Sequence, residues 1–266
     1  MVTPLILIPP SEGKTIGGSG APWHAIDGRP TAALDDARRE VIAALVHAMR
    51  GDLAARSKLL GVGDALTEAA TTTNLAIDSA PTRRAIERYD GVLYGALDHR
   101  TLSKAIRRRL GAQVLIFSGL WGAVAPDDPI PDYKCKMAAV LAPLGKLATW
   151  WRPRLAPLLD ERTAGRVIWN LLPGEHDAAW RPSAHVRTVI RVRFLDDVLR
   201  GGRRQLVVVN HWNKLLKGSL VRHVLATQLH DPDGLAMFTH PEGYVYRPGL
   251  TVVTGNEITV SLVAPR

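Results

Sequence analysis

The sequence has very little cysteine, because only Cys135 among its 266 residues carries a thiol. A single cysteine excludes an internal disulfide framework and is typical of a reducing compartment. The chain also lacks a basic segment followed by a long apolar run, and no stretch approaches the ~18 apolar residues of a membrane span. We therefore expect a soluble, cytoplasmic protein with no signal peptide and no membrane partner.

Residue patterns that bind metals are also missing. The nine histidines do not cluster, and neither a His-Glu-x-x-His motif nor a second cysteine accompanies them. Since transition-metal sites need such groups of nitrogen and sulfur ligands, we expect no metal, and no other cofactor is indicated. Glu175-His176-Asp177 has the residue types that orient a catalytic histidine, but a solvated loop is the simpler interpretation.

Positive charge, in contrast, is abundant. The 34 lysines and arginines exceed the 25 acidic residues by nine, and the isoelectric point is about 10.0. Such a surface attracts phosphate polymers by releasing their counterions. Two acid-free stretches carry many of the bases: Arg100, Lys104, Arg107, Arg108 and Arg109, and then Arg200, Arg203, Arg204, Lys214, Lys217 and Arg222. They favour one basic face, although solvated helix faces give the same count.

Hydrophobic spacing predicts helices and strands in alternation along the chain. The expected helices cover 34–50, two short helices within 53–70, one or two within 81–110, 138–160 (interrupted by prolines) and 217–229. The expected strands cover 5–8, 114–117, 167–172, a hairpin of 188–194 with 206–209, and two or three strands within 235–263. No repeat or linker divides the chain. We therefore expect an α/β fold with one domain over residues 1–266, a mixed sheet flanked by helices.

The segment after the first strand is the most informative of the chain. Two prolines at 9–10 end the strand, because proline has no backbone hydrogen to donate. Ser11, Glu12 and Lys14 follow directly. They lie at the carboxyl end of the strand, where open α/β sheets bind ligands. The pattern indicates either a site for an anion or polar substrate, or an ordinary turn with solvated side chains.

Polar residues gather at two further strand ends, in Ser118–Gly122 and in Asn210–Lys217. If the strands at 5–8, 114–117 and 206–209 lie side by side, the three loops form one cleft. Residues 11–14 match Ser-x-x-Lys and residues 13–15 match the end of a P-loop, but both motifs lack the residues that complete them. The candidate catalytic residues in the cleft are Ser11, Glu12, Lys14 and His211.

The two short helices within 53–70 meet at Gly61 and Gly63. These glycines permit a tight turn, and the amides that open the second helix are able to point at a phosphate. This is the pattern of a helix-hairpin-helix element, which grips a nucleic-acid backbone. A simple break between two packed helices is at least as common, and Asp64 would repel phosphate.

Together these segments resemble the YaaA family of bacterial peroxide-stress proteins. The matching residues are spread over nearly the whole chain: Ile6–Thr15, Ala85–Leu97, Ser118–Gly122, Pro126, Asp128, Pro131, Tyr133, Met137, Asn170-Leu171, Phe194, Lys214, Lys217-Gly218, Arg222 and Glu242–Tyr244. The resemblance implies a family-specific α/β fold with a helix-hairpin-helix element and a positively charged cleft. It also implies DNA binding and a role in limiting oxidative damage.

The resemblance also implies which residues bind phosphate. Lys136 stands where many relatives have glutamate, and the usual Glu-Tyr run after Asn170-Leu171 is replaced by Leu172–Asp177. These departures lie near the expected cleft and put its ligand in doubt. The implied phosphate-binding residues are Lys14, Lys134, Lys214, Lys217 and Arg222, with Lys136 added by its charge and Gly61 and Gly63 by the hairpin.

Two functions follow from the sequence. The first is DNA binding in the peroxide-stress response, with the phosphate backbone in a basic cleft. The alternative is an enzyme that acts on a nucleotide or nucleobase-containing small molecule, with Ser11, Glu12 and Lys14 at its site. Glu12 keeps the alternative open, because a carboxylate is a poor group for gripping a DNA backbone.

Overall fold

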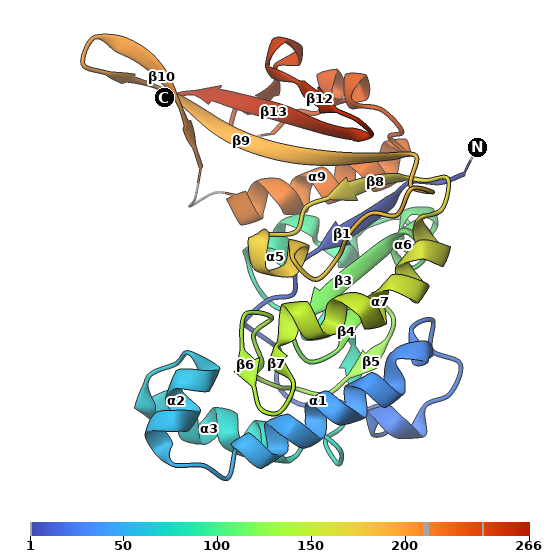
Figure 1. Cartoon of the computed structure of the whole chain (residues 1–266). Coiled ribbons are helices and arrows are strands. Elements are labelled where there is room, and N and C mark those ends of the chain that lie inside the picture. Colours follow the sequence, from blue (N-terminus) through green and yellow to red (C-terminus); the bar gives the residue numbers. More distant parts are fainter. Residues whose placement is uncertain (1, 210–212, 241) are drawn as a thin grey trace.

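A nine-stranded mixed sheet forms the centre of the computed structural model, which describes residues 2–209, 213–240 and 242–266 (Figure 1). Along the sheet the strands follow the order β11-β13-β9-β8-β1-β3-β4, with β10 paired to β9 and β12 paired to β13. The strands are β1 (Leu5–Ile8), β3 (Val114–Ser118), β4 (Gly122–Val124), β8 (Val167–Asn170), β9 (Thr188–Arg200), β10 (Arg203–Val208), β11 (Val245–Tyr246), β12 (Val252–Thr254) and β13 (Glu257–Pro265).

The sheet combines both strand directions, as expected from the sequence. β1 is parallel to its two neighbours, β3 and β8, and β8, β9 and β13 continue the parallel part. β4, β10, β11 and β12 pair antiparallel. Every residue of β1, β3 and β8 is buried, which is why these strands read as unbroken apolar runs.

Helices and two short strand pairs surround this sheet. The α-helices are α1 (Asp35–Ala48), α2 (Leu53–Leu60), α3 (Asp64–Leu75), α4 (Ala85–Arg88), α5 (Val92–Leu97), α6 (Lys104–Gln113), α7 (Leu147–Thr163), α8 (Gly174–Asp177) and α9 (Asn213–Thr227). Short 3₁₀ turns occur at Trp23–Ala25, Ala32–Leu34, His99–Thr101, Pro232–Met237 and Pro248–Leu250. Two further antiparallel pairs lie outside the main sheet: β2 (Arg83–Arg84) with β5 (Pro129–Ile130), which are far apart in the sequence, and the hairpin of β6 (Val140–Leu141) with β7 (Gly145–Lys146). Among the described residues, no helix is long and apolar enough to cross a bilayer.

The expected helix over 138–160 is present from residue 147 onward, but the expected breaks at Pro153 and Pro157 are not. The β6–β7 hairpin occupies the first part, and α7 then runs through Pro153 and Pro157 without a break. A proline inside a helix costs ~3 kcal/mol. Burial of an apolar side chain such as Trp151, Leu155 or Leu159 returns about 1.5–3 kcal/mol each, so the packed face of α7 outweighs its prolines.

The predicted hairpin around Gly201-Gly202 is present, but its second strand is not beside β1 and β3 as expected. β10 instead pairs with the outer half of β9, while β8 pairs with the first half of the same edge. The two-glycine turn, with φ of 55° and 74°, folds β10 back along β9 and fixes this register. β10 therefore ends near the carboxyl end of β8, and α9 begins close to that point.

That residues 1–266 form one domain remains a prediction.

Gly218 allows α9 to pack closely on α5, and its replacement tests this contact. A Cβ at Gly218 would lie 2.2 Å from the Leu93 carbonyl oxygen, whereas a Cβ at Gly95 in α5 would meet nothing within 4 Å. We expect Gly218→Ala to lower the free energy of unfolding by about 1–3 kcal/mol through overpacking. The control Gly95→Ala is expected to raise it by about 0.5–1 kcal/mol. Urea unfolding of both variants checks this, and equal effects would contradict the packing account.

Candidate functional site

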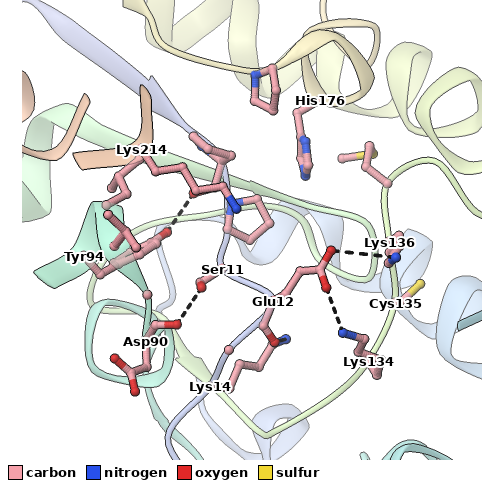
Figure 2. Close-up of a pocket in the computed structure, with 18 of the residues that line it drawn as sticks. Ser11, Glu12, Lys14, Asp90, Tyr94, Lys134, Cys135, Lys136, His176 and Lys214 are labelled. Atoms are coloured by element: carbon pink, nitrogen blue, oxygen red, sulfur yellow. Dashed lines mark hydrogen bonds and ion pairs between the residues drawn. The ribbon is translucent and has the colours of Figure 1, made fainter. Parts of the chain in front are cut away.

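A cavity of about 560 Å³ opens at the carboxyl ends of β1 and β8 (Figure 2). Its walls are residues 9–14 after β1, 90–94 at the start of α5, 133–137, 173–176 after β8, and Lys214 in the first turn of α9. The chain leaves β1 toward β3 and leaves β8 toward β9, on opposite sides. Their loops therefore part at this point of the sheet, which is where ligands bind in open α/β folds.

Backbone pairing fixes the wall that follows β1. The Asp90 N–H donates to the Gly13 carbonyl at 3.0 Å, and the Ser11 hydroxyl donates to the Asp90 carbonyl at 2.6 Å. A Cβ at Gly13 would lie 2.6 Å from that Asp90 oxygen, so only glycine permits this approach. Ser11 thus holds the turn at 90–91, and its hydroxyl proton is already engaged. This arrangement gives Ser11 a structural role, and its place among the catalytic candidates stays a prediction.

The opposite wall, residues 134–136, is held by α3. The buried amide of Asn74 accepts from the Lys134 N–H at 2.8 Å and donates to the Lys134 carbonyl at 2.9 Å. The Lys136 ammonium donates to the carbonyl of Gly61 at 3.2 Å, in the turn between α2 and α3. The segment is thus tied to the helix pair through the main chain of Lys134 and through the side chain of Lys136.

Glu12 lies between these walls, surrounded by lysines. Its carboxylate accepts from Lys134 at 3.1 Å and pairs with Lys136 at 3.7 Å, as Figure 2 shows. The Lys14 ammonium also lies 3.4 Å from the Glu12 carbonyl oxygen. Partial burial raises the pKa of Glu12, but the Lys134 hydrogen bond and the charges of Lys134, Lys136 and Lys214 outweigh it and hold the pKa below its usual value. Glu12 is therefore an anion at neutral pH.

Lys14 is the least hydrated of the four cavity lysines. Its ammonium lies 4.3 Å from the centre of the Tyr133 ring, a cation–π contact. Burial lowers the pKa of Lys14 to about 8, and the neighbouring Lys134 acts in the same direction. Such a group releases its proton more readily than an exposed lysine.

A chain of buried hydroxyl groups supports Lys14 from below. The Tyr133 hydroxyl lies 2.8 Å from the Tyr89 hydroxyl and 2.7 Å from the Ser118 hydroxyl, which in turn accepts from the Trp121 N–H. Burial raises the pKa of Tyr89 to about 12 and that of Tyr133 well above its ordinary value. Both phenols therefore stay protonated and position the aromatic face under Lys14.

His176 lies on the cavity wall, although the sequence favoured a solvated loop there. It is 6% exposed, and in Figure 2 its imidazole points into the cavity. Burial lowers the pKa of His176 to about 4, and the positive charge of Lys217 adds to the effect. Asn170 at the end of β8 holds this turn by donating to Asp177 at 2.7 Å. The missing signal was strand order, since only adjacency of β8 to β1 brings His176 to the site.

The remaining expected site residues lie in several places. Lys214 lines the cavity, while Lys217 is half-buried behind it, with its pKa lowered to about 8 by burial. Arg222 donates to the Leu97 and Asp98 carbonyls at the end of α5, away from the cavity. The second basic stretch is thus divided among the β9–β10 ribbon, the cavity rim and α9. His211 lies outside the described residues.

Cys135 also lines the cavity, between the two lysines of its segment. Burial raises the pKa of its thiol to about 12, although the charge of Lys14 opposes this shift. Peroxide reacts with the thiolate, so Cys135 is poorly prepared to react with it at neutral pH. Within the ranges that the structure describes, no group of three or more histidine, cysteine, aspartate or glutamate side chains is arranged to hold a metal.

Comparisons with known proteins agree in one family. A family model described as peroxide stress protein YaaA matches residues 5–250. A UPF0246 protein of Streptomyces coelicolor is 40% identical over 225 residues, which cover 84% of this chain and 83% of that protein. A UPF0246 protein of Corynebacterium glutamicum is 33% identical, over 91% of this chain and 94% of that protein. A UPF0246 protein of Corynebacterium efficiens is 35% identical, over 84% of this chain and 85% of that protein.

The low pKa of Lys14 predicts a pH-dependent stability. Between pH 8 and 10.5 the unfolded chain keeps a proton on Lys14 that the folded chain has lost, so this group makes stability rise with pH. Lys14→Met removes this pH-dependent contribution to stability. We expect Lys14→Met to raise the free energy of unfolding relative to the wild type by more, or to lower it by less, at pH 7 than at pH 10. Urea titrations at both values, with the exposed Lys58→Met as the control for losing a lysine, check this; an equal change at both pH values would contradict it.

Proposed function

This chain belongs to the YaaA family of peroxide stress proteins, and on that premise we propose that it acts in the stress response by binding DNA. A phosphate-bearing nucleotide unit of the strand occupies the cavity beside β1. The observation that carries the proposal is the gathering of Lys14, Lys134 and Lys136 around one residue, Glu12, in a cavity that Lys214 also lines. Ammonium groups gathered in a concave site are suited to a phosphate.

Glu12 is compatible with this function because it occupies the place of an anion. Its two carboxylate oxygens hold Lys134 and Lys136, as the oxygens of a phosphate would. A phosphate that enters the cavity displaces the Glu12 side chain, which is 67% exposed and free to swing into water. The acid that argued against DNA binding in the sequence thus acts as a counterion for the cavity lysines. The other acids of the wall, Asp90 and Glu175, form no ion pair with these lysines among the described residues.

The pair α2–α3 extends the proposed DNA surface. α2 ends at Leu60 and is followed by Gly61, whose φ of 61° suits a glycine, and α3 begins after Gly63. The hydrogen bond from Lys136 to the Gly61 carbonyl places this turn at the rim of the cavity. The first amides of α3 there are able to face a neighbouring phosphate, which is the helix-hairpin-helix role. Asp64 in the first turn weakens that contact.

A small-molecule enzyme is the second candidate, favoured by the size of the cavity. About 560 Å³ lies within the range of sites for single small ligands. Glu12 would then act as a base and the buried Lys14 would stabilise charge on a nucleotide phosphate. The ion pairs of Glu12 lower its basicity, and for that reason we place binding before catalysis.

Lysine substitutions test the proposed DNA contact. We expect Lys134→Ala and Lys136→Ala each to weaken binding about fivefold and to reduce the salt dependence, d log K/d log [salt], by about 1, because each removes one phosphate contact. The control is Lys146→Ala, an exposed lysine on β7 that does not line the cavity. Fluorescence anisotropy with duplex and single-stranded DNA at two salt concentrations makes the measurement.

The outcomes separate the two functions. Undetectable or salt-insensitive DNA binding by the wild-type protein contradicts the proposal. If DNA does not bind while a nucleotide raises the melting temperature in a thermal-shift assay, the small-molecule function is favoured instead. Equal losses in Lys146→Ala and Lys134→Ala would show that binding uses general surface charge and not the cavity.

A further inference from the structure

His176 lines the cavity, but its neutral imidazole has no evident role in binding a phosphate. Its side chain is more than nine-tenths buried, yet it lines the cavity, and its Nδ1 makes no hydrogen bond within the described part of the chain. The Glu175 carboxylate lies 3.6 Å from Nδ1 and would form an ion pair only with a protonated ring. A buried polar atom without a partner costs about 1–3 kcal/mol, so a ligand gains that energy when the ring turns to present this nitrogen to it.

The cavity around His176 is chemically divided. Figure 2 shows Lys14 and Lys134 on the far side of Glu12 from His176, whose ring projects from the loop after β8. The cavity also has an apolar lining that gives the lysines no counterion and suits a flat, weakly hydrated ring. This lining consists of Pro9, Pro10, Val92, Leu93, Met137 and Pro173.

We propose that His176 binds the edge of a nucleobase whose phosphate is held by the cavity lysines. The proposal rests on the proposed function and specifies it, because it names a nucleotide with its base unpaired and turned into the cavity. The edge of every base carries hydrogen-bond donors and acceptors, and unpaired bases are read in this way while their faces lie against apolar or aromatic side chains.

The charge state of His176 fits this role. With its pKa near 4, the ring is neutral at physiological pH and offers one N–H donor and one acceptor nitrogen. A charged imidazolium would have served as a further phosphate ligand. Burial, with the charge of Lys217 adding to it, keeps the ring neutral, so His176 has the chemistry of a base-reading group and not of a fifth cation.

The test compares ligands that differ only in the base. Isothermal titration measures binding of the nucleoside 5′-monophosphates and of ribose 5-phosphate to the wild-type protein. We expect at least one nucleotide to bind about tenfold tighter than ribose 5-phosphate, the effect of supplying a partner to one buried polar atom. We expect His176→Phe to abolish this preference while leaving ribose 5-phosphate affinity unchanged.

Two further variants keep the test interpretable. His176→Asn retains a polar group near the position of Nδ1 and is expected to keep part of the preference. The control His223→Phe replaces a half-buried histidine that lines a different cavity, and we expect it to change nothing. If His176→Phe does not fold, the wild-type preference and His176→Asn still decide.

The outcomes distinguish the proposed role of His176 from the proposed function on which it rests. Equal binding of nucleotides and ribose 5-phosphate overturns the role of His176 and leaves phosphate binding intact. A base preference that survives in His176→Phe also overturns it. Absence of binding by every ligand, together with absence of DNA binding, overturns the proposed function and this inference with it.

Discussion

Mutual repulsion among the lysines of one cavity is the constraint on which the candidate site depends. Lys14, Lys134 and Lys136 all approach Glu12, and Lys214 is near enough for its charge to lower the pKa of that carboxyl. Without an anion among them, these ammonium groups would destabilise the fold. Glu12 supplies that anion, and it does so from an exposed side chain that is able to leave. The site therefore holds its lysines together and still lets a ligand anion replace the Glu12 carboxylate.

The fold serves this cluster by bringing together segments that are far apart in the sequence. β1 lies between β3 and β8, so the loops that follow β1 and β8 part at one edge of the sheet. Gly13 lets the first loop contact the turn at Asp90, and Asn74 holds the segment 134–136 by hydrogen bonds to the Lys134 main chain. The pairing of β10 along β9 then returns the chain to the same edge, where α9 presents Lys214.

Features set by residues adjacent in the sequence could be predicted, and the pairing of distant strands in the sheet could not. The apolar run of β1, its end at two prolines and the turn at Gly201-Gly202 are local features, and each is present. α7 was misjudged because the burial of side chains such as Trp151 outweighs the prolines, and this depends on what packs against them. His176 was taken for a solvated residue for the same reason. Its place in the cavity depends on the neighbour that β8 acquires in the sheet.

The central claim is that Glu12 occupies the position of a ligand phosphate. Isothermal titration of inorganic pyrophosphate into the wild-type protein, Glu12→Gln and Glu175→Gln tests it most directly. We expect Glu12→Gln to bind at least about fivefold tighter, since the ligand no longer has to break the ion pairs of Glu12, and one pair of charges about 4 Å apart is worth roughly 1 kcal/mol even in water. Glu175 lines the same cavity without a lysine partner among the described residues, so its variant should bind like the wild type. Unchanged or weaker binding by Glu12→Gln would contradict the account.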